Sequence, residues 1–136
     1  PLPVVVLPQS AVVRGDGGYI EILLATPIAF REGETELTGE AEEILRAVGA
    51  YLNDHPELGR VVVLGHGDAG GGREYNVQLT RRRAVATRKF LADDAGVEPG
   101  LLQVPDEGEV DGLMSGLGRR VERNTVSFIL ARASDS

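Results

Sequence analysis

Cysteine is absent from this sequence of 136 residues. Its absence excludes disulfide bonds, thiolate metal sites, cysteine nucleophiles and an acylated N-terminal cysteine, and it leaves the redox compartment open. Histidine is scarce as well, with two residues, His55 and His66. A metal site needs more ligands than this pair offers, and a histidine that flanks a glycine loop is more often structural. We therefore predict neither a metal site nor a cofactor.

Long hydrophobic runs are also missing. Apolar runs such as Val4–Leu7, Ile22–Ala25 and Val61–Leu64 are far shorter than the roughly 20 residues that cross a bilayer. No charged segment followed by an apolar one stands at Pro1, so we expect no signal peptide. These features leave both a cytosolic protein and an excised or processed domain open.

Basic residues are fewer than acidic ones. The sequence has 14 Lys and Arg residues and 21 Asp and Glu residues, which gives a net charge of −7. Binding to nucleic acid usually requires clustered basic charge, so no nucleic-acid partner is expected. The hydrophobic content of 42% is typical of a globular chain, and the length predicts one domain. We place this domain at 11–133, after a linker or irregular segment at 1–10 and before a tail at 134–136.

Two helices are predicted from apolar residues at helical spacing. The first covers about 40–53, with Thr38 as its capping residue, and ends before Pro56. The second covers about 73–94 and ends near Gly96.

Three strands are predicted, at 19–24, 60–65 and 126–130. The first forms a hairpin with 11–14 across a glycine-rich turn at 15–18. The second is continuously apolar, as in a strand buried on both faces, and the third alternates. Segments 27–37 and 105–118 are predicted loops, the former anchored by Phe30. The order strand, helix, strand, helix, strand predicts a two-layer α/β sandwich with a mixed sheet and two main helices.

Asp68 and Arg83 are the most informative candidates for a binding site. Asp68 lies in the glycine-rich loop that joins the second strand to the second helix. Arg83 falls on the apolar stripe marked by Leu79 and Phe90, whereas Arg82 belongs to the solvent face. An arginine on a buried stripe needs a carboxylate partner, and Asp68 is the nearest candidate.

Two interpretations of this pair remain open. In one, Asp68 and Arg83 form a structural ion pair. In the other, they face a shared pocket and hold a zwitterion, with Asp68 on its ammonium group and Arg83 on its carboxylate.

Other chemistries fit the sequence poorly. Gly65, Gly67 and Gly70 match G-x-G-x-x-G literally, but the Asp68 carboxylate between them would repel a pyrophosphate. No serine lies in a G-x-S-x-G context. We predict no catalytic residues and no enzymatic activity.

Two segments of the sequence resemble the signature of a known protein family. These segments are Gly65–Asp68 (GHGD) and Tyr75–Ala84 (YNVQLTRRRA). Together they resemble the signature of OmpA-like domains, the peptidoglycan-associated module also found in Pal lipoproteins and MotB-type stator proteins. Upstream, Ile28–Phe30 followed by Leu37 is similar to the entry into the first helix of that family. The resemblance covers residues 11–131.

The resemblance implies a periplasmic module of the cell envelope, within an outer-membrane or membrane-anchored parent protein. Such modules bind the peptide stem of peptidoglycan non-covalently and thereby tether the parent to the cell wall. The resemblance also implies that Asp68 and Arg83 hold the diaminopimelate residue of the stem. Asn76, Leu79 and Thr80 would line the same pocket.

The sequence departs from the family pattern in two places. Gly67 stands where the family has Thr, which removes a hydroxyl and predicts a looser loop. Residues 123–126 (RNTV) replace the family's N-R-R-V, and Arg123 is the remaining candidate ligand contact there. These departures motivate an alternative, a diverged scaffold that binds other envelope proteins in the periplasm.

Overall fold

The long elements of the chain follow the predicted order. The computed structural model describes residues 6–7, 20–24, 27–68, 72–106, 108–110, 112–113 and 123–130. Its elements are β1 (Val6–Leu7), β2 (Ile20–Leu24), β3 (Ile28–Ala29), α1 (Gly39–Asp54), η2 (Pro56–Leu58), β4 (Val61–Gly65), α2 (Arg73–Asp93), η3 (Pro99–Leu101), β5 (Leu102–Gln103) and β6 (Thr125–Leu130). The predicted hairpin with 11–14 lies outside the described residues.

The sheet is mixed, as predicted. Among the described residues it holds six strands in the order β1-β2-β6-β4-β5, and β3 pairs with β6 beyond the end of β2. β4 runs antiparallel to β6 and parallel to β5. The two longest neighbours, β4 and β6, therefore form the centre of the sheet.

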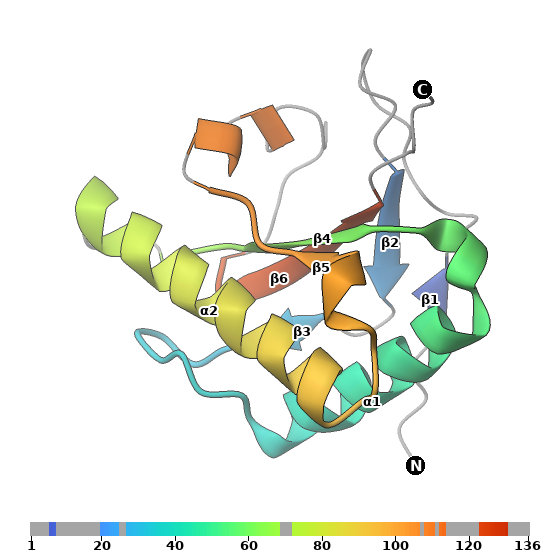
Figure 1. Ribbon diagram of the computed structural model, residues 1–136. Coiled ribbons are helices and arrows are strands. Elements are labelled where there is room, and N and C mark those ends of the chain that lie inside the picture. Colours follow the sequence, from blue (N-terminus) through green and yellow to red (C-terminus); the bar gives the residue numbers. More distant parts are fainter. Residues whose placement is uncertain are drawn as a thin grey trace.

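Both main helices lie on one face of this sheet (Figure 1). Alternate residues of the central strands, among them Val63 and Phe128, point to that face and pack with Ile44 and Leu45 of α1 and Leu91 of α2. All five are essentially inaccessible to solvent. This layer of helices on a sheet confirms the two-layer α/β sandwich.

The opposite face carries a smaller apolar cluster. Val62, Leu64 and Ile129 pack there with Leu113 and the half-buried Val110. Residues 108–110 and 112–113 are helical and lie on the side of the sheet away from α1 and α2 (Figure 1). The prediction of a loop throughout 105–118 is therefore wrong. This cover also explains why all six residues of β6 are buried, although alternation predicted one buried face.

The helix ends confirm the predicted signals. Thr38 Oγ1 accepts a hydrogen bond of 3.0 Å from the Ala41 amide, so it caps α1. After α2, Gly96 adopts a φ of 73°, a left-handed conformation that glycine accepts readily. Segment 27–37 contains the short strand β3 as well as the predicted loop, and Phe30 is buried in the core as expected. In the described part of the chain, no helix combines the length and apolarity needed to span a bilayer.

Candidate ligand-binding site

The candidate site lies where β4 ends and its loop passes along α2. Gly65, the last residue of β4, comes so close to α2 that a Cβ atom would overlap the Thr80 carbonyl oxygen. This close approach brings the following residues, His66 to Asp68, against the face of α2 that carries Arg83. A side chain at position 65 would push the two elements apart.

Arg83 is the largest fully buried side chain of the described residues, with 0% exposure. Its guanidinium also lies over the ring of Phe30, 5.1 Å from the centroid. An arginine has five N–H donors, and here all five are engaged. The acceptors are Glu34 O (2.8 Å from Nε), His66 O and Asn124 Oδ1 (3.0 and 2.9 Å from Nη1), and Arg31 O and Asp68 Oδ1 (3.0 and 3.1 Å from Nη2).

Asp68 is the one charged partner among these acceptors. Its Oδ1 atom lies 3.1 Å from Arg83 Nη2, and its side chain is 4% exposed. Its Oδ2 atom accepts hydrogen bonds from the Gly33 amide (2.9 Å) and the Tyr75 hydroxyl (3.2 Å). Its own amide donates to Asn76 Oδ1 at 3.0 Å. The predicted ion pair between Asp68 and Arg83 is confirmed, and both oxygens of the carboxylate have hydrogen-bond partners within the chain.

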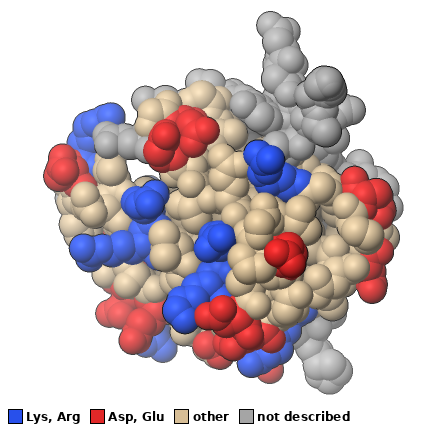
Figure 2. All heavy atoms as spheres, in the orientation of Figure 1, with Lys and Arg blue, Asp and Glu red and all other residues tan. Residues whose placement is uncertain are grey.

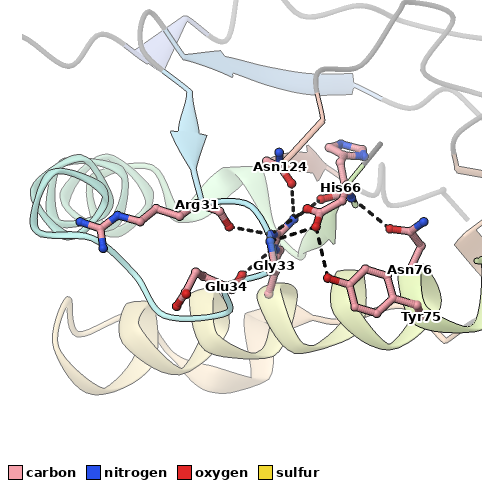
Figure 3. A network of polar contacts seen from close by, with 9 residues as sticks. Arg31, Gly33, Glu34, His66, Tyr75, Asn76 and Asn124 are labelled. Atoms are coloured by element: carbon pink, nitrogen blue, oxygen red, sulfur yellow. Dashed lines mark hydrogen bonds and ion pairs between the residues drawn. The ribbon is translucent and has the colours of Figure 1, made fainter. Parts of the chain in front are cut away.

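Figure 3 shows that three chain segments far apart in sequence converge on this ion pair. The exposed loop 31–34 contributes backbone groups, α2 contributes Tyr75 and Asn76, and the turn before β6 contributes Asn124. In this arrangement the two charges close on each other and on the loop. A ligand that uses both charges must therefore take the place of some of these contacts.

Tyr75 contributes an exposed side chain to the network, at 45% exposure. Partial desolvation of its hydroxyl, followed by the negative charge and hydrogen bond of Asp68, raises the pKa of Tyr75 above its usual value of 10.0. The hydroxyl therefore stays protonated and acts as a donor to Asp68 across the neutral pH range.

The other predicted site residues lie at different depths. Asn76 is half-buried and holds the Asp68 amide. Thr80 is half-buried, and its hydroxyl donates to the Val77 carbonyl of its own helix. Leu79 is buried at 5% exposure, so it supports the site from the interior and lines no open surface. Arg123 is exposed in the turn before β6.

Gly67 lies in a part of the loop that is hydrogen-bonded to two other segments. Its carbonyl accepts a 3.0 Å hydrogen bond from the Asn124 amide, and the amide of the next residue is held by Asn76. A Cβ atom at position 67 would lie 2.5 Å from Asn76 Oδ1. The missing side chain therefore leaves room for Asn76 to bind the loop.

Sequence reasoning missed two side chains of the network. Tyr75 was part of the motif that carried the resemblance but was not assigned to the site. Asn124 was quoted only as part of a departure, yet its amide oxygen binds Arg83 and its φ is 62°. Asparagine is enriched among residues with positive φ, so a tight turn at 123–124 was the available signal.

His66 lies beside the glycine loop, and its ring contacts a side chain of β6. Its ring is buried, and Nε2 lies 2.7 Å from Ser127 Oγ on β6. Its carbonyl accepts from Arg83. No cluster of three potential metal ligands occurs among the described residues.

The fold and the site together define a class of domain, a two-layer α/β module with a buried Asp–Arg pair at the end of a central strand. The model of the OmpA family matches residues 29–124, which contain the whole network. The chain belongs to the OmpA family.

Characterised relatives include two peptidoglycan-associated lipoproteins. The protein from Haemophilus influenzae is 43% identical over 74 residues, which are 54% of this chain and 47% of the relative. The protein from Agrobacterium fabrum is 40% identical over 65 residues, 48% of this chain and 36% of the relative. The chain thus spans less than half the length of these relatives.

Solved structures share the fold. The peptidoglycan-associated lipoprotein from Burkholderia pseudomallei gives a TM-score of 0.59 at 21% identity, covering 78% of this chain and 90% of the other. The C-terminal domain of Helicobacter pylori MotB gives 0.60 at 20% identity, covering 81% and 88%. At these identities the likeness concerns the fold.

Proposed function

We propose that this domain binds the peptide stem of peptidoglycan non-covalently and tethers a parent protein of the cell envelope to the wall. The single observation that carries the proposal is the buried ion pair of Asp68 and Arg83 at the loop after β4. Membership of the OmpA family and similarity to peptidoglycan-associated lipoproteins support it. The proposed role is one of binding, without catalysis.

In this proposal Asp68 accepts the ammonium group of diaminopimelate and Arg83 binds its carboxylate. The free end of that residue is a zwitterion, and its ammonium and carboxylate groups are complementary in charge to Asp68 and Arg83. Hydrogen bonds between ionised groups are roughly twice as strong as neutral ones. A guanidinium can also hold a carboxylate through two parallel bonds.

In this proposal the ligand takes the hydrogen-bonding positions at Asp68 and Arg83 that the loop 31–34 occupies in the structure. The Gly33 amide donates to Asp68 where the ammonium would donate, and the carbonyls of Arg31 and Glu34 accept from Arg83 where the carboxylate would accept. The loop is exposed and offers neutral groups. We infer that the ligand displaces it and replaces neutral partners with charged ones.

The remaining predicted residues take supporting roles in this proposal. Asn76 holds the loop that carries Asp68, and Thr80 packs beside Gly67. Leu79 supports the helix from the core. Arg123 is exposed in the turn that contains Asn124. In this proposal it binds a further carboxylate of the stem.

A titration followed by amide NMR signals tests the proposal with free meso-diaminopimelate and a stem tripeptide. We expect shifts confined to residues 31–34, 66–68 and 75–83. Asp68→Asn keeps the shape and one acceptor for Arg83 but removes the charge, and should weaken binding at least tenfold. Asp54→Asn, the same change at an exposed position, should leave binding unchanged. Equal affinity in Asp68→Asn would refute the site.

The second candidate is a diverged scaffold that binds another envelope protein. The observation in its favour is that all five N–H donors of Arg83 are already engaged within the chain. Co-sedimentation with purified sacculi separates the two functions. A folded domain that stays in the supernatant, with no response to diaminopimelate, would favour the protein partner.

A further inference from the structure

A concave surface lies on another side of α2. It is a groove of about 520 Å³ between α2 and the segment from η3 to β5, within the size range of binding sites for small ligands. We call it the arginine groove, after the three arginines among its lining residues, Arg60, Arg81 and Arg88. No acidic residue occurs among its described lining residues. In a chain of net charge −7, this is a local reversal of sign.

The arginine groove is separate from the Asp68 site. Arg81, Val85 and Arg88 follow one another at steps of four and three residues, so they form one stripe of α2. Arg83 belongs to the buried face of the same helix. None of the residues that line the groove hydrogen-bonds to Asp68 or Arg83, so ligands could occupy both sites together.

Arg88 is held in place at the groove. Its Nε donates to the Leu102 carbonyl at 2.9 Å and its Nη2 to the Pro99 carbonyl at 3.0 Å. Three of its five N–H donors have no partner among the described residues. Because the guanidinium is already oriented, an incoming acceptor orders it at little further entropic cost.

Arg81 and Arg60 complete the charge of the groove. Both side chains are exposed, and neither makes a hydrogen bond or ion pair with any residue that the structure describes. On the face shown in Figure 2, Lys and Arg side chains gather over α2. No described residue pairs with the charge of Arg81 or Arg60.

The groove also presents apolar surface. Val85 is 44% exposed and lies between the two α2 arginines, and Pro99 and Val104 lie on the opposite wall. Val85 is one of the three large hydrophobic side chains that are exposed among the described residues. Arginine beside exposed apolar side chains is the composition expected of a protein interface.

We propose that the arginine groove docks an acidic segment of a partner protein, with carboxylates on the arginines and an apolar side chain on Val85. Charge complementarity selects this occupant, because three arginines stand in one groove with no acidic neighbour in its described lining. Arginine binds carboxylates through its planar pair of donors. The domain would then hold the partner while its Asp68 site remains free for the wall.

Binding of a fluorescein-labelled peptide of sequence EELEE, measured by fluorescence anisotropy, tests the proposal. We expect saturable binding that weakens with added salt, and at least tenfold weaker binding of the uncharged peptide QQLQQ. Amide NMR shifts should map to residues 81–88 and 99–104. No saturable binding, or shifts confined to 31–34 and 66–68, would overturn the proposal.

Matched variants separate a site from general attraction. Arg81→Gln and Arg60→Gln should each weaken EELEE binding at least fivefold. Arg82→Gln removes the same charge from the neighbouring exposed position, which does not line the groove, and should change binding less than twofold. An equal loss in Arg82→Gln would show non-specific electrostatics and overturn the proposal.

A second copy of this acidic chain is the competing occupant. Sedimentation equilibrium of the unmodified domain should show a monomer. Self-association that disappears in Arg81→Gln would identify another copy in the groove and overturn the assignment to a different protein. Unchanged binding of diaminopimelate in Arg81→Gln would confirm that the groove and the Asp68 site are independent.

Discussion

The Oδ1 atom of Asn124 lies 2.9 Å from Nη1 of Arg83, although 41 residues separate the two in sequence. The Asn124 amide also donates to the Gly67 carbonyl, and its own carbonyl accepts from the Phe30 amide. One turn residue thus connects α2, the loop after β4 and the segment after β3. The buried guanidinium is the common centre of these connections.

Replacing Arg83 should destabilise the domain strongly. Arg83→Met leaves the Asp68 carboxylate and several carbonyls buried without their partner, and breaking such a pair costs about 3–5 kcal/mol. The free energy of unfolding in urea measures this loss. Arg82→Met, at the exposed neighbouring position, should change stability by less than about 0.5 kcal/mol. Similar values for the two variants would contradict the central role of Arg83.

Asn124 allows backbone conformation and hydrogen bonding to be separated. Its φ of 62° is strained for alanine but not for glycine. Asn124→Gly should therefore lower the free energy of unfolding only by the loss of the hydrogen bond to Arg83. Asn124→Ala should lower it by about 1–2 kcal/mol more, because alanine is strained in the left-handed conformation. Urea unfolding of both variants checks this order. Equal stabilities would mean that the turn changes its conformation in the variants.

A side chain at position 67 should destabilise the domain while Asn76 is present. The new Cβ in Gly67→Ala would meet Asn76 Oδ1 and displace it from the Asp68 amide, at a cost of about 1–3 kcal/mol. In an Asn76→Ala background the same change should cost less, because the clashing atom is gone. Gly72→Ala, which meets no atom within 4 Å, is the control. Additive losses in the double variant would contradict the contact.

Weakening the loop 31–34 should strengthen ligand binding. Gly33 has a φ of 73°, so Gly33→Ala strains the loop by about 1–2 kcal/mol in the position that closes the site. If the ligand displaces the loop, its affinity should rise about tenfold. Titration with meso-diaminopimelate measures this change, and Gly39→Ala at the start of α1 is the control. Weaker binding would show that the loop forms part of the liganded site.

The Tyr75 hydroxyl should lose its proton at a higher pH than an ordinary tyrosine. Its pKa is raised in the folded protein, so its contribution to stability is complete below the ordinary value of 10.0 and is lost as the pH rises above it. The difference in tyrosinate absorbance between the protein and Tyr75→Phe gives this titration directly. Its midpoint should lie above 10.0 and fall in Asp68→Asn. A midpoint at or below 10.0 would contradict the contact.

The sequence by itself determined the framework of this domain. Helical spacing and the Thr38 cap located α1, the continuous apolar run located β4, and the apolar stripe of α2 showed that Arg83 is buried. These features depend on local periodicity and on the energetic need to pair a buried charge. For that reason the partner Asp68 could also be predicted.

Only the tertiary structure decided how the site is closed. The acceptors of Arg83 include three backbone carbonyls, and a carbonyl is present at every residue, so it leaves no signature in the sequence. Two of them lie 49 and 52 residues away, on a loop whose position depends on the packing of β3 and α1. The contact between Gly67 and Asn76 likewise depends on the close approach of β4 to α2. Periodicity determines which face of an element is buried, whereas the groups that meet there depend on how distant segments pack.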